Sequence, residues 1–270
     1  MPAAYAHYTF GSKCINTLPD TIREACVSNR DIFNLGVHGP DILFYYRFVT
    51  PNNINDYGSK LHEKSGRSFF ENARDVYEQN PEDPATLSYI FGFLAHFAMD
   101  SVCHAYVWEL DKTTPYSHNF IESCFESHLM RKAGFEPTRF DRRIILHPTK
   151  AAAKTIAAFF PFSESEINEA LVGQVQAMGL LYSPNGLKKR GLTWFVEHLP
   201  VSDDFADLFL SNKTPKDLVE PLLHLDELAK EALALYPTLA ENLWKYLHHE
   251  EDLNDHFDMN FEGELKKSVS

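Results

Sequence analysis

Three residues with metal-binding side chains recur every four positions in one apolar stretch of the chain. Residues 94–107, LAHFAMDSVCHAYV, contain His96, Asp100 and His104. On an α-helix a step of four residues turns the chain by about 400°, so these side chains share one stripe of the surface. The residues between them are almost all apolar, which predicts a buried helix. Buried imidazoles and carboxylates are costly unless they are paired, hydrogen-bonded or bound to a metal, and this ligand set suits zinc or iron.

A second pair with the same spacing follows at once. His118 and Glu122 lie four residues apart in the stretch 117–130, which also has the apolar spacing of a helix. Five candidate ligands therefore occupy two consecutive helices joined by a short loop that contains Pro115. The alternative is a polar core of hydrogen-bonded histidines and a buried carboxylate. Five such residues in register favour a metal site.

Three further residues could join this set. His7 lies near the start of the chain in an aromatic setting, and Asp41 follows a Gly-Pro break at residues 39–40. His62 lies near the start of another predicted helix. Each has an ordinary alternative, since Asp41 could cap a helix and His62 could be a solvated histidine.

The chain is long enough for one large domain or two small ones, and we favour one. It has 270 residues, and no run approaches the roughly 18 to 20 uninterrupted apolar residues of a membrane span. No segment alternates like a strand for long. We predict an all-α, single compact multi-helix domain over residues 1–250, followed by an acidic, frayed tail over residues 251–270.

Helical spacing continues beyond the candidate ligands. Apolar periodicity predicts helices over 150–159 and 164–178, the second capped by Ser163. Two more helices are predicted over 221–235 and 239–247. This half of the chain offers no further ligand pattern.

Charge, cysteines and the first residues exclude several classes. The net charge of -13 disfavours binding to nucleic acid. Four widely spaced cysteines without a Cys-x-x-Cys pair argue for reduced thiols rather than a disulfide framework or a cysteine zinc site. The start, Met-Pro-Ala-Ala-Tyr-Ala-His, has neither the basic residues nor the apolar stretch of a signal peptide, so we expect a cytoplasmic protein.

Taken in order, these residues resemble the bacterial zinc-dependent phospholipase C family, which shares its all-helical fold with the S1/P1 nucleases. The matching motifs are GPDILFYY at residues 39–46, His96-x-x-x-Asp100 followed by His104, and His118-x-x-x-Glu122. They cover roughly the first half of the chain, and paired motifs in this order are fairly specific.

The resemblance implies a cluster of two or three zinc ions, although iron and manganese also accept nitrogen and oxygen ligands. It assigns to the first ion Asp41, His62, His96 and Asp100, with Asp100 bridging to another ion. It assigns to the second ion His104, His118 and Glu122. It assigns to the third ion His7 and Asp100, joined in the secreted members by the N-terminal amine and carbonyl. Asp41 is also implied as the general base.

The function implied is that of a metal-dependent phosphodiesterase of phospholipase C type, which cleaves a phospholipid or another small phosphodiester between glycerol and phosphate. A nuclease or nucleotidase on the same scaffold is a second reading, which the acidic composition and the lack of a basic strand-binding stripe disfavour. A third reading is a structural or sensor protein in which the metals hold helices together without turnover. An open coordination position would separate the two catalytic readings from the structural one.

Overall fold

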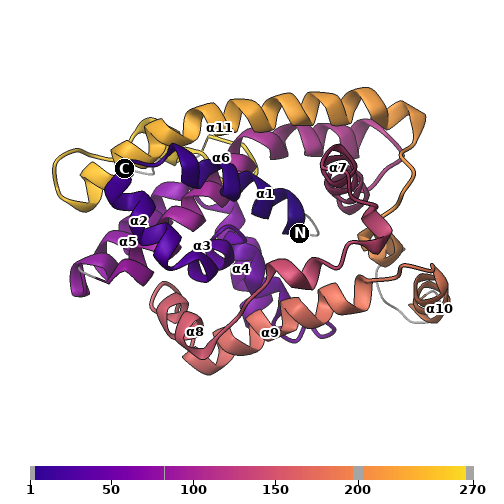
Figure 1. Cartoon of the computed structure of the whole chain (residues 1–270), viewed down its shortest axis with the longest axis horizontal. Helices are drawn as coiled ribbons and strands as arrows, with labels where there is room; N and C mark the ends of the chain where they lie inside the picture. Colours follow the sequence, from indigo (N-terminus) through magenta and orange to yellow (C-terminus); the bar gives the residue numbers. More distant parts are fainter. Residues whose placement is uncertain (1–3, 82, 197–202, 266–270) are drawn as a thin grey trace.

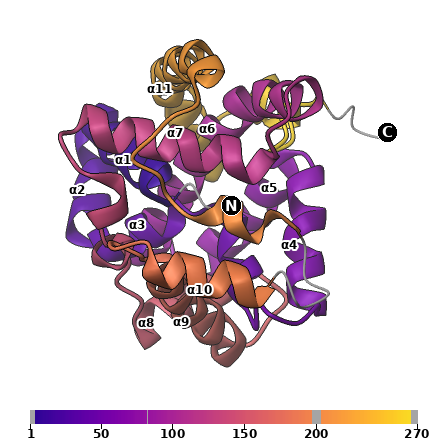
Figure 2. The same ribbon diagram turned by 90° about the vertical axis from the view of Figure 1, so that its right-hand side faces the viewer.

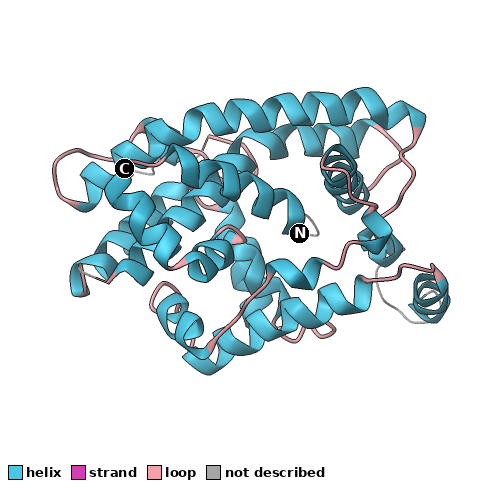
Figure 3. Ribbon diagram, in the orientation of Figure 1, coloured by secondary structure: helices cyan, strands magenta, loops and turns pink. Residues whose placement is uncertain are grey.

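Helices follow one another along nearly all of the chain. The computed structural model describes residues 4–81, 83–196 and 203–265. Figures 1 and 3 show helices joined by loops, and the extended pairing within these residues is limited to two isolated bridges. The predicted all-α fold is confirmed.

The α-helices in chain order are α1 (Ala4–Cys14), α2 (Asp20–Ser28), α3 (Arg30–Gly36), α4 (Asn53–Glu63), α5 (Gly66–Gln79), α6 (Pro84–Thr113), α7 (His118–Lys132), α8 (Lys150–Ala157), α9 (Glu164–Leu181), α10 (Leu187–Val196) and α11 (Val219–Leu247). Two 3-10 helices matter for the site, η2 (Gly39–Tyr45) and η7 (Asp255–Asp258).

Helix α6 forms the axis of the domain. The carboxylate of Asp83 caps its start by accepting hydrogen bonds from the backbone N–H groups of Ala85 and Thr86, at 3.1 Å each, and Pro84 occupies the first turn. Residues 86–101 are buried without interruption. By length and composition α6 could cross a bilayer, but 83% of its most apolar window is buried inside the protein. It is therefore the central core helix that the sequence predicts.

Two glycines let α3 approach α6 closely. A Cβ atom at Gly36 would lie 2.7 Å from the carbonyl oxygen of Tyr89, and one at Gly92 would lie 2.4 Å from the carbonyl oxygen of Phe33. Neither distance leaves room for a side chain, so the two backbones are in direct contact. Because η2 follows α3 in the chain, this contact also places the start of η2, which carries Asp41, next to α6.

Helix α11 runs along α6 on one side of the domain (Figure 1). The prediction of two helices, 221–235 and 239–247, is wrong, because α11 continues through Pro237. A proline removes one intrahelical hydrogen bond. Packing against α6 outweighs that loss, since Tyr236 is fully buried and its hydroxyl donates to the carbonyl oxygen of Phe91 at 3.0 Å.

Helices α8 and α9 lie on the opposite side of the domain from α11 (Figure 2). Both predicted helices are confirmed, and so is the cap at Ser163. Its hydroxyl accepts a hydrogen bond from the backbone of Glu166, whose carboxylate in turn accepts one from the backbone of Ser163. Helix α9 packs beneath η2 and supports the segment that carries Asp41.

The chain after α11 returns to the core. We call residues 253–264 the C-terminal segment. Phe257 and Phe261 within it are both fully buried, and Arg67 at the start of α5 forms an ion pair with the segment. The expectation of a frayed tail over 251–270 is therefore wrong for its described part. Burial of these two aromatic side chains offsets part of the conformational entropy that the segment loses, and its hydrogen bonds and the ion pair with Arg67 add to it.

Candidate metal centre

All eight residues singled out from the sequence come together inside the domain. They fall into three groups, in each of which one ligand atom per residue lies within 4.8 Å of the others. The first group is Asp41, His62 and His96, the second is His104, His118 and Glu122, and the third is His7, His96 and Asp100. Two groups therefore share His96, and the cluster draws on five elements, namely α1, η2, α4, α6 and α7.

In the first group, each imidazole is oriented through its Nδ1 atom. His62 Nδ1 lies 2.8 Å from the carbonyl oxygen of Gly58, and His96 Nδ1 lies 3.2 Å from that of Val37. Donation from Nδ1 to a carbonyl leaves Nε2 free to face the centre of the group. His62 Nε2 lies 3.1 Å from Asp41 Oδ1. His62 is buried, so the reading of it as a solvated histidine is wrong.

A glycine in the left-handed backbone conformation places Asp41. Gly39 has φ of +49°, and a Cβ atom there would lie 2.2 Å from Cδ2 of His96. Glycine is thus required both by the backbone and by the ring packed against it. The cap of η2 is His38, which makes no side-chain cap hydrogen bond. The reading of Asp41 as a helix cap is therefore wrong, and its carboxylate points to His62 instead.

The second group joins α6 to α7. Glu122 Oε1 lies 3.2 Å from Nε2 of His104 and 3.2 Å from Nε2 of His118. His118 and Glu122 are one turn apart at the start of α7, where the hydroxyl of Ser117 caps the helix. His104 Nδ1 lies 2.8 Å from the carbonyl oxygen of Phe261, which again turns Nε2 toward the group.

Asp100 lies between the groups. Its Oδ1 atom is 3.3 Å from His7 Nε2 and 3.7 Å from His104 Nε2, and its Oδ2 atom is 2.9 Å from His96 Nε2. One carboxylate thus reaches three imidazoles, which come from both ends of the stripe on α6 and from α1. The N-terminal amine, which the resemblance implies as a further ligand, lies outside the described residues.

Electrostatic interactions in the cluster oppose the effect of burial. Burial alone would raise the pKa of Asp100 and Glu122, but nearby positive charge, that of the imidazoles included, outweighs it and holds both pKa values below their usual range. Burial lowers the pKa of His104, yet the carboxylates of Asp100 and Glu122 raise it to about 10. Burial and the nearby His96 lower the pKa of His7 to about 4. The cluster therefore combines ionised carboxylates with the neutral imidazole of His7, and a metal ion bound at His104 would displace the proton that its raised pKa retains.

Two atoms at the centre of the cluster, His96 Nε2 and Asp100 Oδ2, are placed as metal ligands rather than as a hydrogen-bonded pair. His96 Nε2 and Asp100 Oδ2 approach to 2.9 Å, but neither has a partner with hydrogen-bond geometry among the described residues. Two buried polar atoms that converge in this way resemble two ligands of one ion. Imidazole nitrogens and carboxylate oxygens are the ligands that zinc accepts in catalytic sites, so the residues present fit zinc.

A cleft of about 430 Å³ opens over the first and second groups. Four of the eight residues form part of its wall, and two aromatic rings, three small polar side chains and three further carboxylates complete it. The lining residues are Asp41, His62, His104, His118, Phe44, Trp108, Ser59, Ser117, Asn119, Glu63, Asp111 and Glu262. The cluster is therefore reachable by a small molecule.

Some residues of the site escaped the sequence analysis. Phe261 and Glu262 come from the stretch expected to be a frayed tail, and Trp108 donates a hydrogen bond from Nε1 to the carboxylate of Glu262. No spacing rule connects residues more than 150 positions apart. The acidic residues of that tail were the one available signal, and acidic tails are usually solvated.

A buried ion pair supports the third group from behind. Arg142 donates from Nη1 to Oε2 of Glu126 at 2.8 Å, and both side chains are almost fully buried. Glu126 also accepts a hydrogen bond from the backbone N–H of Tyr5, two residues before His7. This carboxylate lies one turn beyond Glu122 on α7. It therefore ties the start of α1 to the helix that carries the second group.

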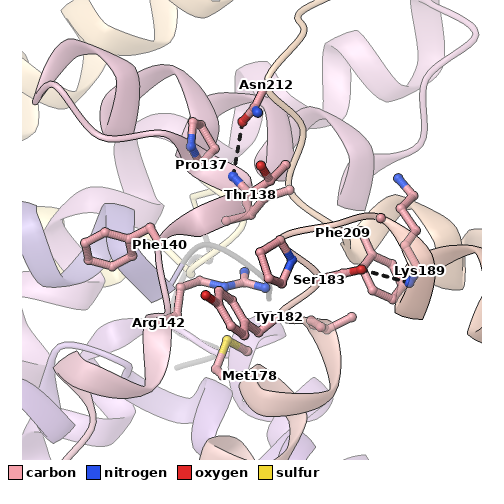
Figure 4. A pocket seen from close by; sticks show the side chains of 14 residues that line it. Pro137, Thr138, Phe140, Arg142, Met178, Tyr182, Ser183, Lys189, Phe209 and Asn212 are labelled. Carbon is pink, nitrogen blue, oxygen red and sulfur yellow. Dashed lines mark hydrogen bonds between the residues drawn. The ribbon is translucent and has the colours of Figure 1, made fainter.

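A second cavity, of about 260 Å³, lies beyond this ion pair. Figure 4 shows the guanidinium of Arg142 among the lining side chains, with Phe140 on one side and Lys189 on the other. None of the eight candidate ligands lines it. It is separate from the cleft over the cluster.

Comparison with known families agrees with the site. The family described as zinc dependent phospholipase C matches residues 6–170, which is more than half of the chain. No curated protein and no solved structure matches the chain with significance. All eight candidate ligands lie inside the matched region, whereas the C-terminal segment lies outside it. With its all-α fold of phospholipase C/P1 nuclease type, the chain belongs to the zinc-dependent phospholipase C family.

Proposed function

We propose that this protein is a metal-dependent phosphodiesterase that cleaves a phospholipid between glycerol and phosphate. The observation that carries the proposal is the convergence of eight ligand-type side chains at the wall of an open cleft. Structural zinc sites are closed by protein ligands, whereas catalytic sites keep a position for water or substrate. A cleft that reaches Asp41, His62, His104 and His118 supports the catalytic reading.

In the proposed hydrolysis, the metal ions and the protein side chains have different roles. Two or three bound zinc ions would supply an activated water and neutralise charge on the phosphoryl oxygens. Asp41 would accept the proton of the attacking water, because it faces the cleft and its carboxylate is ionised near neutral pH. His62 would hold that carboxylate in place through the 3.1 Å contact between Nε2 and Oδ1.

The main alternative is a nuclease or nucleotidase on the same scaffold. Three carboxylates that belong to none of the metal groups line the cleft, namely Glu63, Asp111 and Glu262. They would repel the extended phosphate backbone of a nucleic acid, and the net charge of -13 acts in the same direction. A single phosphodiester meets less repulsion, so the acidic cleft favours a small substrate.

A non-catalytic metal protein is the other alternative. It would use the same ligands to hold α1, α4, α6 and α7 together without turnover. The open cleft supports catalysis, and an activity measurement separates the two.

The test is to purify the protein without chelator, count the metals per chain by elemental analysis, and assay a panel of phospholipid, nucleotide and bis(p-nitrophenyl) phosphate substrates. His104→Ala removes a member of the second group, and His147→Ala replaces an exposed histidine as the matched control. We expect two or three zinc ions per chain and release of diacylglycerol from phospholipid in wild type and in His147→Ala, and in His104→Ala at least one ion fewer together with loss of hydrolysis. Bound zinc without hydrolysis of any substrate would support the non-catalytic alternative, and preferred hydrolysis of nucleotides would support the nucleotidase.

A further inference from the structure

One residue of the C-terminal segment contacts three of the candidate metal ligands. The backbone N–H of Phe261 donates to the carbonyl oxygen of His62 at 3.2 Å, and its carbonyl oxygen accepts from Nδ1 of His104 at 2.8 Å. Its ring packs against the rings of His62 and His96, with centroids 5.6 and 5.9 Å apart. Phe261 thus joins the first metal group to the second.

The backbone of Phe261 is held on both sides. Before it, the carbonyl oxygen of Met259 accepts a hydrogen bond from the backbone N–H of Gly66 at 2.8 Å. After it, the side-chain oxygen of the fully buried Asn260 accepts from the backbone N–H groups of Glu262 and Glu264, at 3.1 and 2.7 Å. The turn around Phe261 is therefore fixed by side-chain and backbone contacts.

The next residue extends these contacts into the cleft. Glu262 accepts a hydrogen bond from Nε1 of Trp108, and its Oε2 atom lies 3.9 Å from Nδ1 of His104. Trp108 is one turn beyond His104 on α6. The C-terminal segment therefore contacts α6 at the ligand itself and again at the mouth of the cleft.

We propose that the C-terminal segment is an integral part of the metal centre, and that Phe261 is the positioning residue that aligns His62 with His104. The inference rests on the proposed metal centre and goes beyond it, because the segment lies outside the region matched by the family. The carbonyl oxygen of Phe261 selects the tautomer of His104 in which Nε2 is the free ligand atom. The ring of Phe261 limits the rotation of the His62 side chain.

The positioning role of Phe261 can be tested by measuring the affinity of the protein for zinc. Partners that orient a metal-bound histidine are typically worth about 10- to 100-fold in metal affinity. Phe261→Leu reduces ring packing on His62 and His96. Phe257→Leu is the matched control, since Phe257 is equally buried in the same segment but packs on the rings of Phe70 and Phe97.

A second pair of variants acts on the backbone. Asn260→Ala releases the turn that presents the carbonyl of Phe261. Asn254→Ala is its control, because the side chain of Asn254 caps η7 in the same segment, at the backbone N–H of His256. Each pair compares a change near the metal groups with a similar change away from them.

The experiment is to titrate chelator-treated full-length variants with zinc and to record their thermal unfolding. We expect Phe261→Leu and Asn260→Ala to weaken zinc binding by about tenfold or more, while both controls stay within about twofold of wild type. Equal affinities in variants and controls of equal stability would overturn the inference and leave the proposed function intact. If wild type itself binds no zinc, the proposed metal centre fails first, and the inference fails with it.

Discussion

Nε2 of His104 and Oε1 of Glu122 lie 3.2 Å apart, although the two residues belong to different helices and are separated by 18 positions in the chain. The loop between α6 and α7 brings them together, and His118 reaches the same carboxylate oxygen at the same distance. The second metal group therefore depends on how two helices pack as well as on the spacing within each.

The carboxylate of Glu122 is expected to be necessary for one metal ion. In Glu122→Gln the charge shared by His104 and His118 is lost while the size of the side chain is kept, so elemental analysis should show at least one ion fewer per chain. Glu109→Gln changes an exposed carboxylate on α6 and should keep the wild-type content. Unchanged metal content in Glu122→Gln would contradict the assignment of the second group.

Removal of metal is expected to lower the stability of the fold. Ligand binding to the folded state contributes about 2.7 kcal/mol when the free ligand is at 100 times its Kd. Chelator should therefore lower Tm by several degrees, and added zinc should restore it. If Tm responds to neither treatment, the cluster is a packed polar core that does not need a metal.

Asp41 is expected to carry the proton transfer. Asp41→Asn removes the base and also a charged member of the first metal group, so kcat should fall by about 10²- to 10⁴-fold even when zinc is added to saturation. Steady-state kinetics and elemental analysis on the same preparation check this. Asp75→Asn, which replaces an exposed carboxylate on α5 away from the cleft, is the control and should keep kcat within about tenfold of wild type. Similar losses in both variants would argue against Asp41 as the base.

Gly39 is expected to tolerate no side chain. Gly39→Ala would place Cβ 2.2 Å from the ring of His96 at φ of +49°, so we expect a loss of about 1–3 kcal/mol in the free energy of unfolding, together with weaker zinc binding. Gly191→Ala is the control, because nothing described lies within 4 Å of its Cβ position and its φ is ordinary for an L-residue. Denaturant unfolding measures both. A Gly39→Ala protein as stable as the control would show that the ring of His96 moves freely.

The ion pair between Arg142 and Glu126 is expected to give a pH-dependent effect. Burial is the main cause that raises the pKa of Glu126, and Arg142 opposes it. Arg142→Met should therefore cost about 3–5 kcal/mol at pH 7, where a buried carboxylate loses its partner. A raised pKa in the folded state means that the protonated form is favoured there, so the cost should shrink as pH falls through that raised pKa toward the unfolded value. Urea unfolding at pH 7 and at pH 5 tests the sign.

Local patterns of residue spacing were sufficient to predict part of the site. His96, Asp100 and His104 share a stripe because the helical repeat dictates it, and the apolar residues between them dictate that the helix is buried. The same reasoning gives His118 and Glu122, and the motif order adds His7, Asp41 and His62. The all-helical fold follows from periodicity in the same way, and so do the helices α8 and α9 with the cap at Ser163.

The contacts that join distant parts of the chain follow from how the helices and the C-terminal segment pack together. Phe261 and Glu262 reach His104 across more than 150 positions, and no periodicity reports such a contact. Their segment has the acidic composition of a solvated tail, but burial of two aromatic rings holds it in the core. Helix α11 likewise continues through Pro237 because packing on α6 outweighs one lost hydrogen bond. Spacing fixes which residues share a helix face, whereas the packing of helices fixes which faces meet.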